Sequence, residues 1–189
     1  LRGTHHCNGG FSIMSELRVD KIYPKNGLPS GSGGGIVQVK YVDMDTMRGP
    51  FNGNYDAYSD ITGLSLSFTP QSASNLIYIR TTFNVIVQTD QSWDEAFAYF
   101  GLFNGSTVLN ESGITNRWGN SSSAGRIQCD VSLDHWEGAS STNARTYNCK
   151  AKIQQNGYYC YVCPDYVYAT GGSREMNNHG YITVMEVSG

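Results

Sequence analysis

The sequence predicts an all-β protein, folded as an antiparallel, jelly-roll-like β-sandwich, and two observations lead to this prediction. Charged residues make up only 15% of the 189 residues, compared with about 25% in average proteins, and strong helix formers rarely occur in runs. Apolar and polar residues also alternate with a period of two in several short segments separated by turn formers. A chain of this size can fill its own core, because a domain of about 150 residues buries roughly 70% of its unfolded surface.

One pair of segments organises the rest of the chain. Residues 63–70 alternate leucine and phenylalanine with serine and threonine, which places the apolar side chains on one face of a strand. Residues 71–75 are polar, and residues 76–87 are rich in β-branched and aromatic residues. We therefore expect two neighbouring core strands, the second turning back beside the first.

Further strands follow from the same signals. Asn104-Gly105 between two apolar runs is a type I′ hairpin signal, and Asn156-Gly157 is a second hairpin signal. Pro164 ends the strand that follows the second turn or puts it at a sheet edge. The remaining expected strands are residues 36–42, 96–103, 106–109, 126–133, 144–153, 158–162 and 181–187, with loops at 43–60 and 110–125.

The last expected strand divides its side chains between two faces. Ile182 and Val184 point one way, and the same period places Glu186 with them, while Tyr181 and Met185 point the other way with Thr183 and Val187. Residues 36–42 and the tyrosine-rich strands supply more apolar surface than one small core needs. We expect a homotrimer that buries the excess.

The charge balance excludes some partners. The net charge is -3 and the isoelectric point is near 5.7, which leaves no basic patch to neutralise phosphates, so no nucleic acid and no anionic membrane surface are expected as partners. No apolar run approaches the ~20 residues that cross a bilayer. The N-terminus also lacks the features of a signal peptide. We expect a soluble protein without membrane insertion that is not secreted by that route.

The five cysteines are odd in number, so at least one thiol stays unpaired if the others pair within the chain. Cys160 and Cys163 have the spacing of zinc ligands, but a four-ligand site needs a second pair, and the sequence has no second Cys-x-x-Cys. On a strand, positions i and i+3 point to opposite faces. We expect reduced, separate thiols and no metal.

The first 35 residues differ from the rest. Residues 1–13 have no periodicity, and Met14-Ser15 has the form of a natural start, so we hypothesise that residues 1–13 come from upstream translation. A short extended segment and a glycine-rich linker follow, ending at Gly35. A phosphate cradle is not expected there, because the Gly-Lys-Ser/Thr of a P-loop is missing. The expected organisation is an arm at residues 1–35 and a β-sandwich at residues 36–189.

Several segments together resemble small virion appendage proteins of tailed bacteriophages, particularly cyanophage proteins described as tail fibres. The resemblance rests on residues 15–22, on the Gly-Leu-Pro-Ser and polyglycine linker that leads into residues 36–39, on residues 62–70 and on residues 182–187. It covers residues 14–87 and 181–189 and departs from the pattern in the middle of the chain.

The resemblance implies a location and partners. It implies a protein of the virion, assembled in the host cytoplasm, whose arm docks on other virion structural proteins while a trimeric sandwich faces outward. Partner specificity would then lie in residues 90–180. The arm residues expected to make the attachment are Leu17, Val19, Ile22, Tyr23 and Leu28.

Three tryptophans, Trp93, Trp118 and Trp136, lie in polar, loop-like contexts. Exposed aromatic rings stack on sugars, which makes these residues candidates for binding a host surface polysaccharide. The alternative is that they pack under loops or in a trimer interface.

No catalytic signature is present. The Gly-x-Ser-x-Gly, His-Glu-x-x-His and EF-hand patterns are missing, and the densest polar cluster, Asp134-His135-Trp136-Glu137, is explained by a solvated loop. We therefore expect no enzyme, no catalytic residue and no cofactor. Three hypotheses remain open: a receptor-binding fibre, a capsid decoration protein that stabilises the shell, and a glycan-degrading enzyme.

Overall fold

The structure is a computed structural model, and it describes residues 35–51, 57–89, 95–117, 126–153, 158–164, 166–169, 172–175 and 178–189. Every regular element in these residues is a β-strand, which confirms the all-β prediction. The strands are β1 (Ile36–Met44), β2 (Arg48–Phe51), β3 (Ser59–Phe68), β4 (Leu76–Thr89), β5 (Glu95–Asn104), β6 (Thr107–Arg117), β7 (Arg126–Gly138), β8 (Arg145–Ile153), β9 (Tyr158–Val162), β10 (Tyr166–Ala169), β11 (Gly172–Glu175) and β12 (Gly180–Val187).

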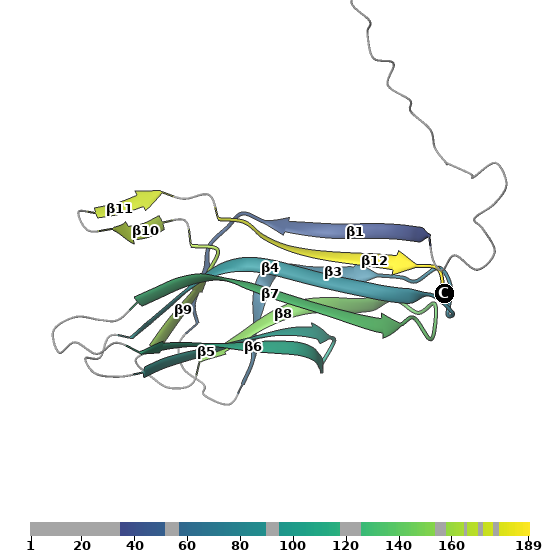
Figure 1. Cartoon of the computed structure of the whole chain (residues 1–189), viewed down its shortest axis with the longest axis horizontal. Helices are drawn as coiled ribbons and strands as arrows, with labels where there is room; N and C mark the ends of the chain where they lie inside the picture. The colour runs from purple at the N-terminus through teal and green to yellow at the C-terminus, as the bar shows by residue number, and fades with distance from the viewer. Residues whose placement is uncertain are drawn as a thin grey trace, which may run out of the picture. The chain divides into compact units, whose positions relative to one another are not determined.

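The larger sheet is built around β4, its longest strand (Figure 1). β7 pairs with β4 along one edge. On the other edge, β12 pairs with the first half of β4 and β9 pairs with the second half. β1 then lies outside β12, and β2 lies outside β9.

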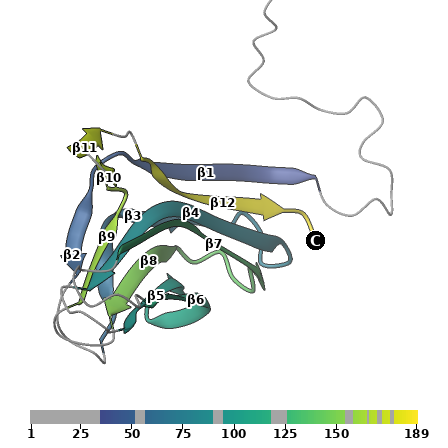
Figure 2. The ribbon, with the colours of Figure 1, turned by 60° about the vertical axis from the view of Figure 1, so that its left-hand side comes forward.

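The smaller sheet has the strand order β3-β8-β5-β6, and β10 pairs with β11 in a separate two-stranded sheet. All of these strand pairs are antiparallel. The chain crosses repeatedly between the two main sheets, which face each other as the layers of a β-sandwich (Figure 2). This agrees with the expected sandwich class.

The core fills the space between the two sheets. Alternate residues of β4 point inward, as the period of two requires, and they meet alternate residues of β3, β5 and β8 from the other sheet. The largest fully buried side chains of this core are Tyr147, Phe68, Phe83, Phe100, Ile61, Leu64, Ile77, Ile79, Leu102, Ile153 and Ile182.

The expected pairing of residues 63–70 with 76–87 is wrong. Both segments are core strands, but β3 pairs with β8 in the smaller sheet, whereas β4 pairs with β7, β9 and β12 in the larger one. Residues 69–75 therefore carry the chain from one layer to the other. The apolar faces of β3 and β4 both turn toward the core between the two sheets, which buries both of them.

The expected return of residues 158–162 beside 144–153 is wrong for the same reason. β8 belongs to the smaller sheet, while β9 lies between β4 and β2 in the larger one. The turn expected at Asn156-Gly157 lies outside the described residues.

The β5–β6 hairpin is confirmed, but its turn is displaced by one residue. Asn104 pairs with Thr107, so the loop residues are Gly105 and Ser106. Gly105 has a φ of 61°, and Ser106 is not among the described residues with positive φ. A positive φ at the first loop residue alone is the pattern of a type II′ turn, not the expected type I′.

Strands also occupy segments that were expected as loops. β7 continues through residues 134–137, β6 continues to Arg117, and β2 lies within residues 43–60. β6 and β7 are edge strands, whose free side tolerates polar residues. The polar composition of these parts of β6 and β7 therefore reflects their position at a sheet edge rather than a loop. Trp136 is consequently a strand residue.

A buried carboxylate fastens the end of β12 to two other parts of the sandwich. Glu186 is fully buried, and it lies on the same face as Ile182 and Val184, as the alternation of the last strand predicted. It accepts hydrogen bonds from Gln38 Nε2 of β1 at 2.5 Å and Asn75 Nδ2 at 2.6 Å. The backbone amides of Gln71 and Ser72 donate to it at 2.8 and 3.2 Å. The connection between β3 and β4 is thus tied to both β1 and β12.

The protonation state of Glu186 follows from these contacts. Burial by itself raises the pKa of Glu186, but hydrogen bonds from the side chains of Gln38 and Asn75 and from the Ser72 and Gln71 amides outweigh it and lower this pKa below its ordinary value. The carboxylate therefore stabilises the fold only while it is charged.

Glu186→Gln should lower the free energy of unfolding by about 1–3 kcal/mol, because an amide NH2 then faces buried donors and leaves them unsatisfied. In the wild type, the contribution of this carboxylate is present above its ordinary pKa of 4.5 and is lost as the pH falls through its lowered folded pKa. The variant should lack this part of the acid dependence. Urea unfolding at neutral and acidic pH measures both effects. Asp45→Asn, which changes an exposed carboxylate, is the control. If Glu186→Gln and the wild type lose stability equally as the pH falls, the role assigned to Glu186 is wrong.

Candidate functional site

The polar cluster of residues 134–137 does not form a common site. It lies on β7, where Asp134 and Trp136 point away from the smaller sheet. His135 and Glu137 share the inward face with the buried residues of β4 that they pair with. The neighbouring side chains diverge, as expected for a strand.

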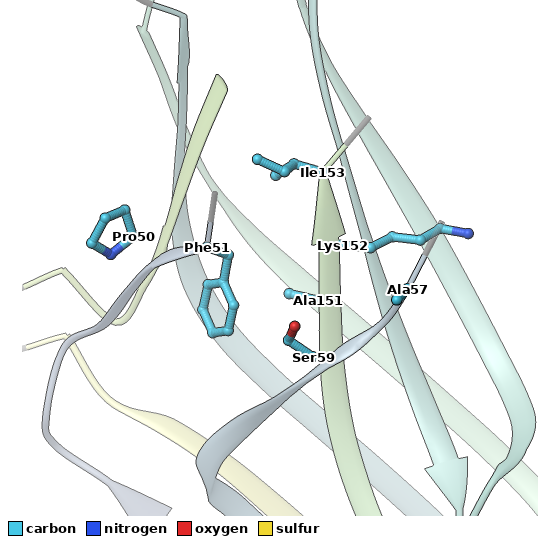
Figure 3. A pocket seen from close by; sticks show the side chains of 7 residues that line it. All are labelled: Pro50, Phe51, Ala57, Ser59, Ala151, Lys152 and Ile153. Carbon is cyan, nitrogen blue, oxygen red and sulfur yellow. The ribbon is translucent and has the colours of Figure 1, made fainter. Parts of the chain in front are cut away.

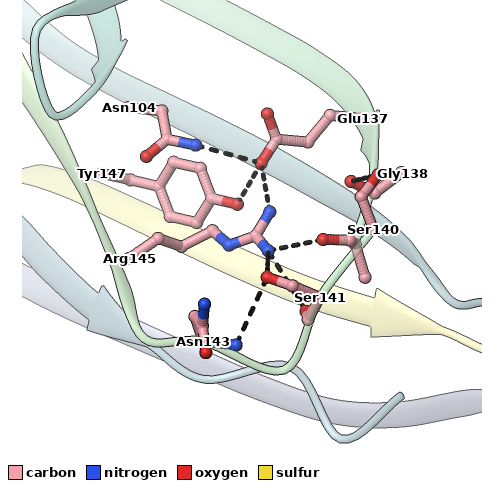
Figure 4. Close-up of polar contacts among 9 residues, drawn as sticks. Asn104, Glu137, Gly138, Ser140, Ser141, Asn143, Arg145 and Tyr147 are labelled. Atoms are coloured by element: carbon pink, nitrogen blue, oxygen red, sulfur yellow. Dashed lines mark hydrogen bonds and ion pairs between the residues drawn. The ribbon is translucent and has the colours of Figure 1, made fainter. Parts of the chain in front are cut away.

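Glu137 instead organises a structural cluster, shown in Figure 4. Its Oε1 accepts hydrogen bonds from Arg145 Nη1 at 3.1 Å, Tyr147 Oη at 2.5 Å and Asn104 Nδ2 at 3.3 Å. Arg145 also donates to the carbonyl oxygens of Ala139 and Ser141. Burial and the hydrogen bond to Glu137 raise the pKa of Tyr147 well above its ordinary range, so its hydroxyl stays a donor. The cluster joins β7 to β8 and β5 of the opposite sheet.

The described cysteines are not activated nucleophiles. Cys129, Cys149, Cys160 and Cys163 are unpaired, and Cys7 lies outside the described residues. Burial raises the pKa of Cys149 to about 12 and that of Cys163 to about 11, and it raises the pKa of Cys160 further. A thiol that stays protonated attacks substrates poorly. Among the described residues, no group of three or more His, Cys, Asp or Glu side chains could hold a metal ion.

A pocket of about 140 Å³ lies between the start of β3 and the end of β8, lined by Pro50, Phe51, Ala57, Ser59, Ala151, Lys152 and Ile153. In Figure 3 the Lys152 side chain extends away from Phe51. Its Nζ lies 4.5 Å from the ring centre of Tyr58 and 4.9 Å from that of Tyr99. The one charged group of the lining is therefore engaged with aromatic rings, and the pocket offers no pair of groups for acid–base chemistry.

The feature that stands out is the outer face of the larger sheet, the face turned away from the smaller sheet. Seven large hydrophobic side chains are exposed in the described part of the chain, and only Val108 lies elsewhere. The pairing registers place the other six on this face, together with three half-buried residues. We call this set the outer apolar surface: Ile36, Val39, Tyr41, Leu76, Tyr78, Trp136, Tyr181, Met185 and Val187.

The strand registers explain how the surface arises from distant segments. Val39 of β1, Met185 of β12, Tyr78 of β4 and Trp136 of β7 are successive cross-strand partners, and directly opposed residues of antiparallel strands point to the same face. They form one row across four strands. Rows with Leu76 and Val187 on one side and Tyr41 on the other extend the surface.

The Tyr78 and Trp136 rings form the part of this surface nearest the β7 edge. Their ring centres are 4.7 Å apart and the rings are inclined by 33°. Trp136 remains 53% exposed. Packing on Tyr78 orients the indole while leaving half of it open to solvent.

Only part of the expected site lies in the described chain. Trp136 does, on a strand rather than on the expected loop. Trp93, Trp118 and the arm residues Leu17, Val19, Ile22, Tyr23 and Leu28 lie outside the described residues. Sequence reasoning missed Leu76 and Tyr78, although the apolar residues on both faces of the first half of β4 were a usable signal.

The comparisons with known proteins leave the family open. No protein-family model matches the chain, and no curated protein matches it. Within the described residues, the structure contains no helix long and apolar enough to cross a membrane.

Some solved structures have a low similarity. The dimeric latent PorU of Porphyromonas gingivalis is 10% identical over 82% of this chain, with a TM-score of 0.40. A chain of infectious bursal disease virus, Gx strain, is 7% identical over 80%, with a TM-score of 0.23. A chain of deformed wing virus, a honeybee pathogen, is 11% identical over 100%, with a TM-score of 0.19. This chain spans 13%, 41% and 55% of their lengths, and at these scores the likeness carries no argument about function.

Trp136→Ala should lower the free energy of unfolding by only about 1 kcal/mol, because an aromatic pair contributes roughly 0.5–1.5 kcal/mol beyond burial. Tyr147→Ala should cost about 3–5 kcal/mol, the range for removing a buried aromatic side chain. Urea unfolding followed by circular dichroism compares the two. A Trp136→Ala variant as unstable as Tyr147→Ala would place this ring in the core.

Proposed function

We propose that this protein is a structural component of a tailed-phage virion, a fibre or appendage protein that acts through its surface. An N-terminal arm at residues 1–35 attaches it to other virion proteins, and a homotrimer of β-sandwiches faces outward. The protein is assembled in the host cytoplasm. The outer apolar surface is the observation that carries the proposal, and the resemblance of residues 14–87 and 181–189 to phage appendage proteins supports the virion role.

The physical argument concerns exposure. Tyr41 is 72% exposed, and its neighbours Val39 and Tyr181 are also exposed. Contiguous exposed apolar side chains of this kind mark interaction surfaces in soluble proteins. β1 is also an edge strand, paired only with β12 among the described residues, and such an edge is open to further contacts. We assign the subunit contact to this β1–β12 half of the outer apolar surface.

Capsid decoration is the second candidate, because an arm with one sandwich domain suits a shell clamp as well as a fibre. The copy number in purified particles separates the two. A number in proportion to the capsid subunits indicates decoration, and a number in proportion to the tail fibres indicates a fibre. A glycan-degrading enzyme is the third candidate, and sugar release from host envelope by the purified protein would favour it.

The first test of the proposal is assembly. Sedimentation equilibrium at micromolar concentration should give about three times the chain mass of 20.8 kDa. Tyr41→Lys should raise the trimer dissociation constant by more than about tenfold, because it places a charge in an apolar contact.

Val108→Lys is the matched control. Val108 is also exposed, at 46%, but it lies on β6 of the smaller sheet, so its substitution should leave the trimer intact. A monomeric wild type, or equal effects of the two lysines, would contradict the assigned contact.

The second test concerns the arm. Deletion of residues 1–34 should leave the sandwich and its trimer intact, because the core strands begin at Ile36 and a polar, glycine-rich arm buries too little apolar area to contribute. Incorporation into particles should be abolished. Particle-bound protein is measured after complementation of a deletion phage, and normal incorporation of the truncated protein would refute the role of the arm.

A further inference from the structure

We propose that the β4–β7 half of the outer face binds a neutral glycan chain. The Tyr78 and Trp136 rings form its stacking platform. Polar residues farther along the same two strands supply the groups that hydrogen-bond to the glycan. We call these residues the polar ladder: Arg80, Thr82, Asn84, Asp130, Ser132 and Asp134. The inference deepens the proposed function and rests on it for the outward orientation of this face.

The ring platform offers the apolar part of the site. Sugar rings have a face of C–H groups that packs on aromatic rings, and tyrosine and tryptophan combine such a surface with a polar group. The Trp136 side chain is half exposed, and its ring packs against the Tyr78 ring, with 4.7 Å between the two ring centres. The platform therefore exists before any ligand arrives.

The polar ladder lies directly beside the platform. Its members face each other across the two strands as Arg80 with Asp134, Thr82 with Ser132 and Asn84 with Asp130. Successive rows on one face are two residues apart, or roughly 7 Å. A chain molecule lying along the strands would meet rings first and then hydroxyl, amide and charged groups that bond to sugar hydroxyls.

Hydrogen bonds within the ladder fix its side chains. The Thr82 and Ser132 hydroxyl oxygens are 3.2 Å apart. Asn84 Nδ2 donates to Asp130 Oδ1 at 2.8 Å and accepts at its Oδ1 from Gln128 Nε2 at 2.7 Å. Side chains that are already ordered lose little entropy on binding.

The charge of the ladder selects the kind of ligand. Arg80 faces Asp134 and Asp130 faces Asn84, while Arg126 lies farther along the same face of β7, so the charges on this face are nearly balanced. A face without excess positive charge offers no electrostatic attraction to a polyanion, which argues against nucleic acids and acidic polysaccharides as ligands. A protein partner would have to remove these charges from water, whereas a glycan presents its own hydroxyl groups to them. A neutral glycan fits both the platform and the ladder.

Titration calorimetry of the full-length protein with cellohexaose, maltohexaose and mannohexaose tests the inference. The wild type should bind at least one of them. Trp136→Ala should weaken this binding by roughly tenfold, and Asn84→Ala with Ser132→Ala should weaken it several-fold. Val108→Ala, at an equally exposed apolar residue of the smaller sheet, should bind as the wild type does.

Each other outcome has a defined meaning. A wild type that binds none of the three sugars, a Trp136→Ala variant with full affinity, or tighter binding of hexagalacturonate than of the neutral sugars would overturn the inference. Loss of the trimer in Trp136→Ala would also overturn it, because the ring would then belong to the subunit contact. None of these results bears on particle incorporation, so failure of glycan binding is distinguishable from failure of the virion role.

Discussion

The pairing of β4 with three other strands is the interaction on which the rest of the structure depends. β7 covers one edge of β4 along nearly its whole length, and β12 and β9 share the other edge. Because side chains alternate between the two faces of a strand, the same fourteen residues supply the centre of the core and the centre of the outer face. A change of register by one residue would move the core side chains to the outer face and the outer side chains into the core. The residues that must be buried therefore also determine which residues are exposed.

Two carboxylates, the buried Glu186 and the half-buried Glu137, complement this apolar framework. Hydrophobic contact between sheets is strong but non-directional, whereas hydrogen bonds to a carboxylate fix particular groups. Glu137 connects β7 to β5 and β8 across the sandwich. Glu186 holds the connection between β3 and β4 against β12 and β1. In both places the acid is a structural hydrogen-bond acceptor.

The outer face combines two kinds of surface on one sheet. Near β1 and β12 it is apolar and lies at a sheet edge, which suits contact between subunits. Along β4 and β7 it changes from aromatic rings to ordered polar pairs, which suits a hydroxyl-rich ligand. Such a surface suits binding and assembly, and its repetition around the proposed trimer would multiply weak contacts.

The sequence by itself determined the all-β class, the positions of most strands and the shared face of Ile182, Val184 and Glu186, because alternation is a local property that a single strand carries. Only the tertiary structure decided which strands are partners. The segment between Phe68 and Leu76 has the composition of a turn. This composition is the same whether the chain returns within one sheet or crosses to the other sheet. The row of Val39, Met185, Tyr78 and Trp136 could not be predicted for the same reason: it joins four strands distant in sequence, and their alignment is set by the shared core rather than by any local signal.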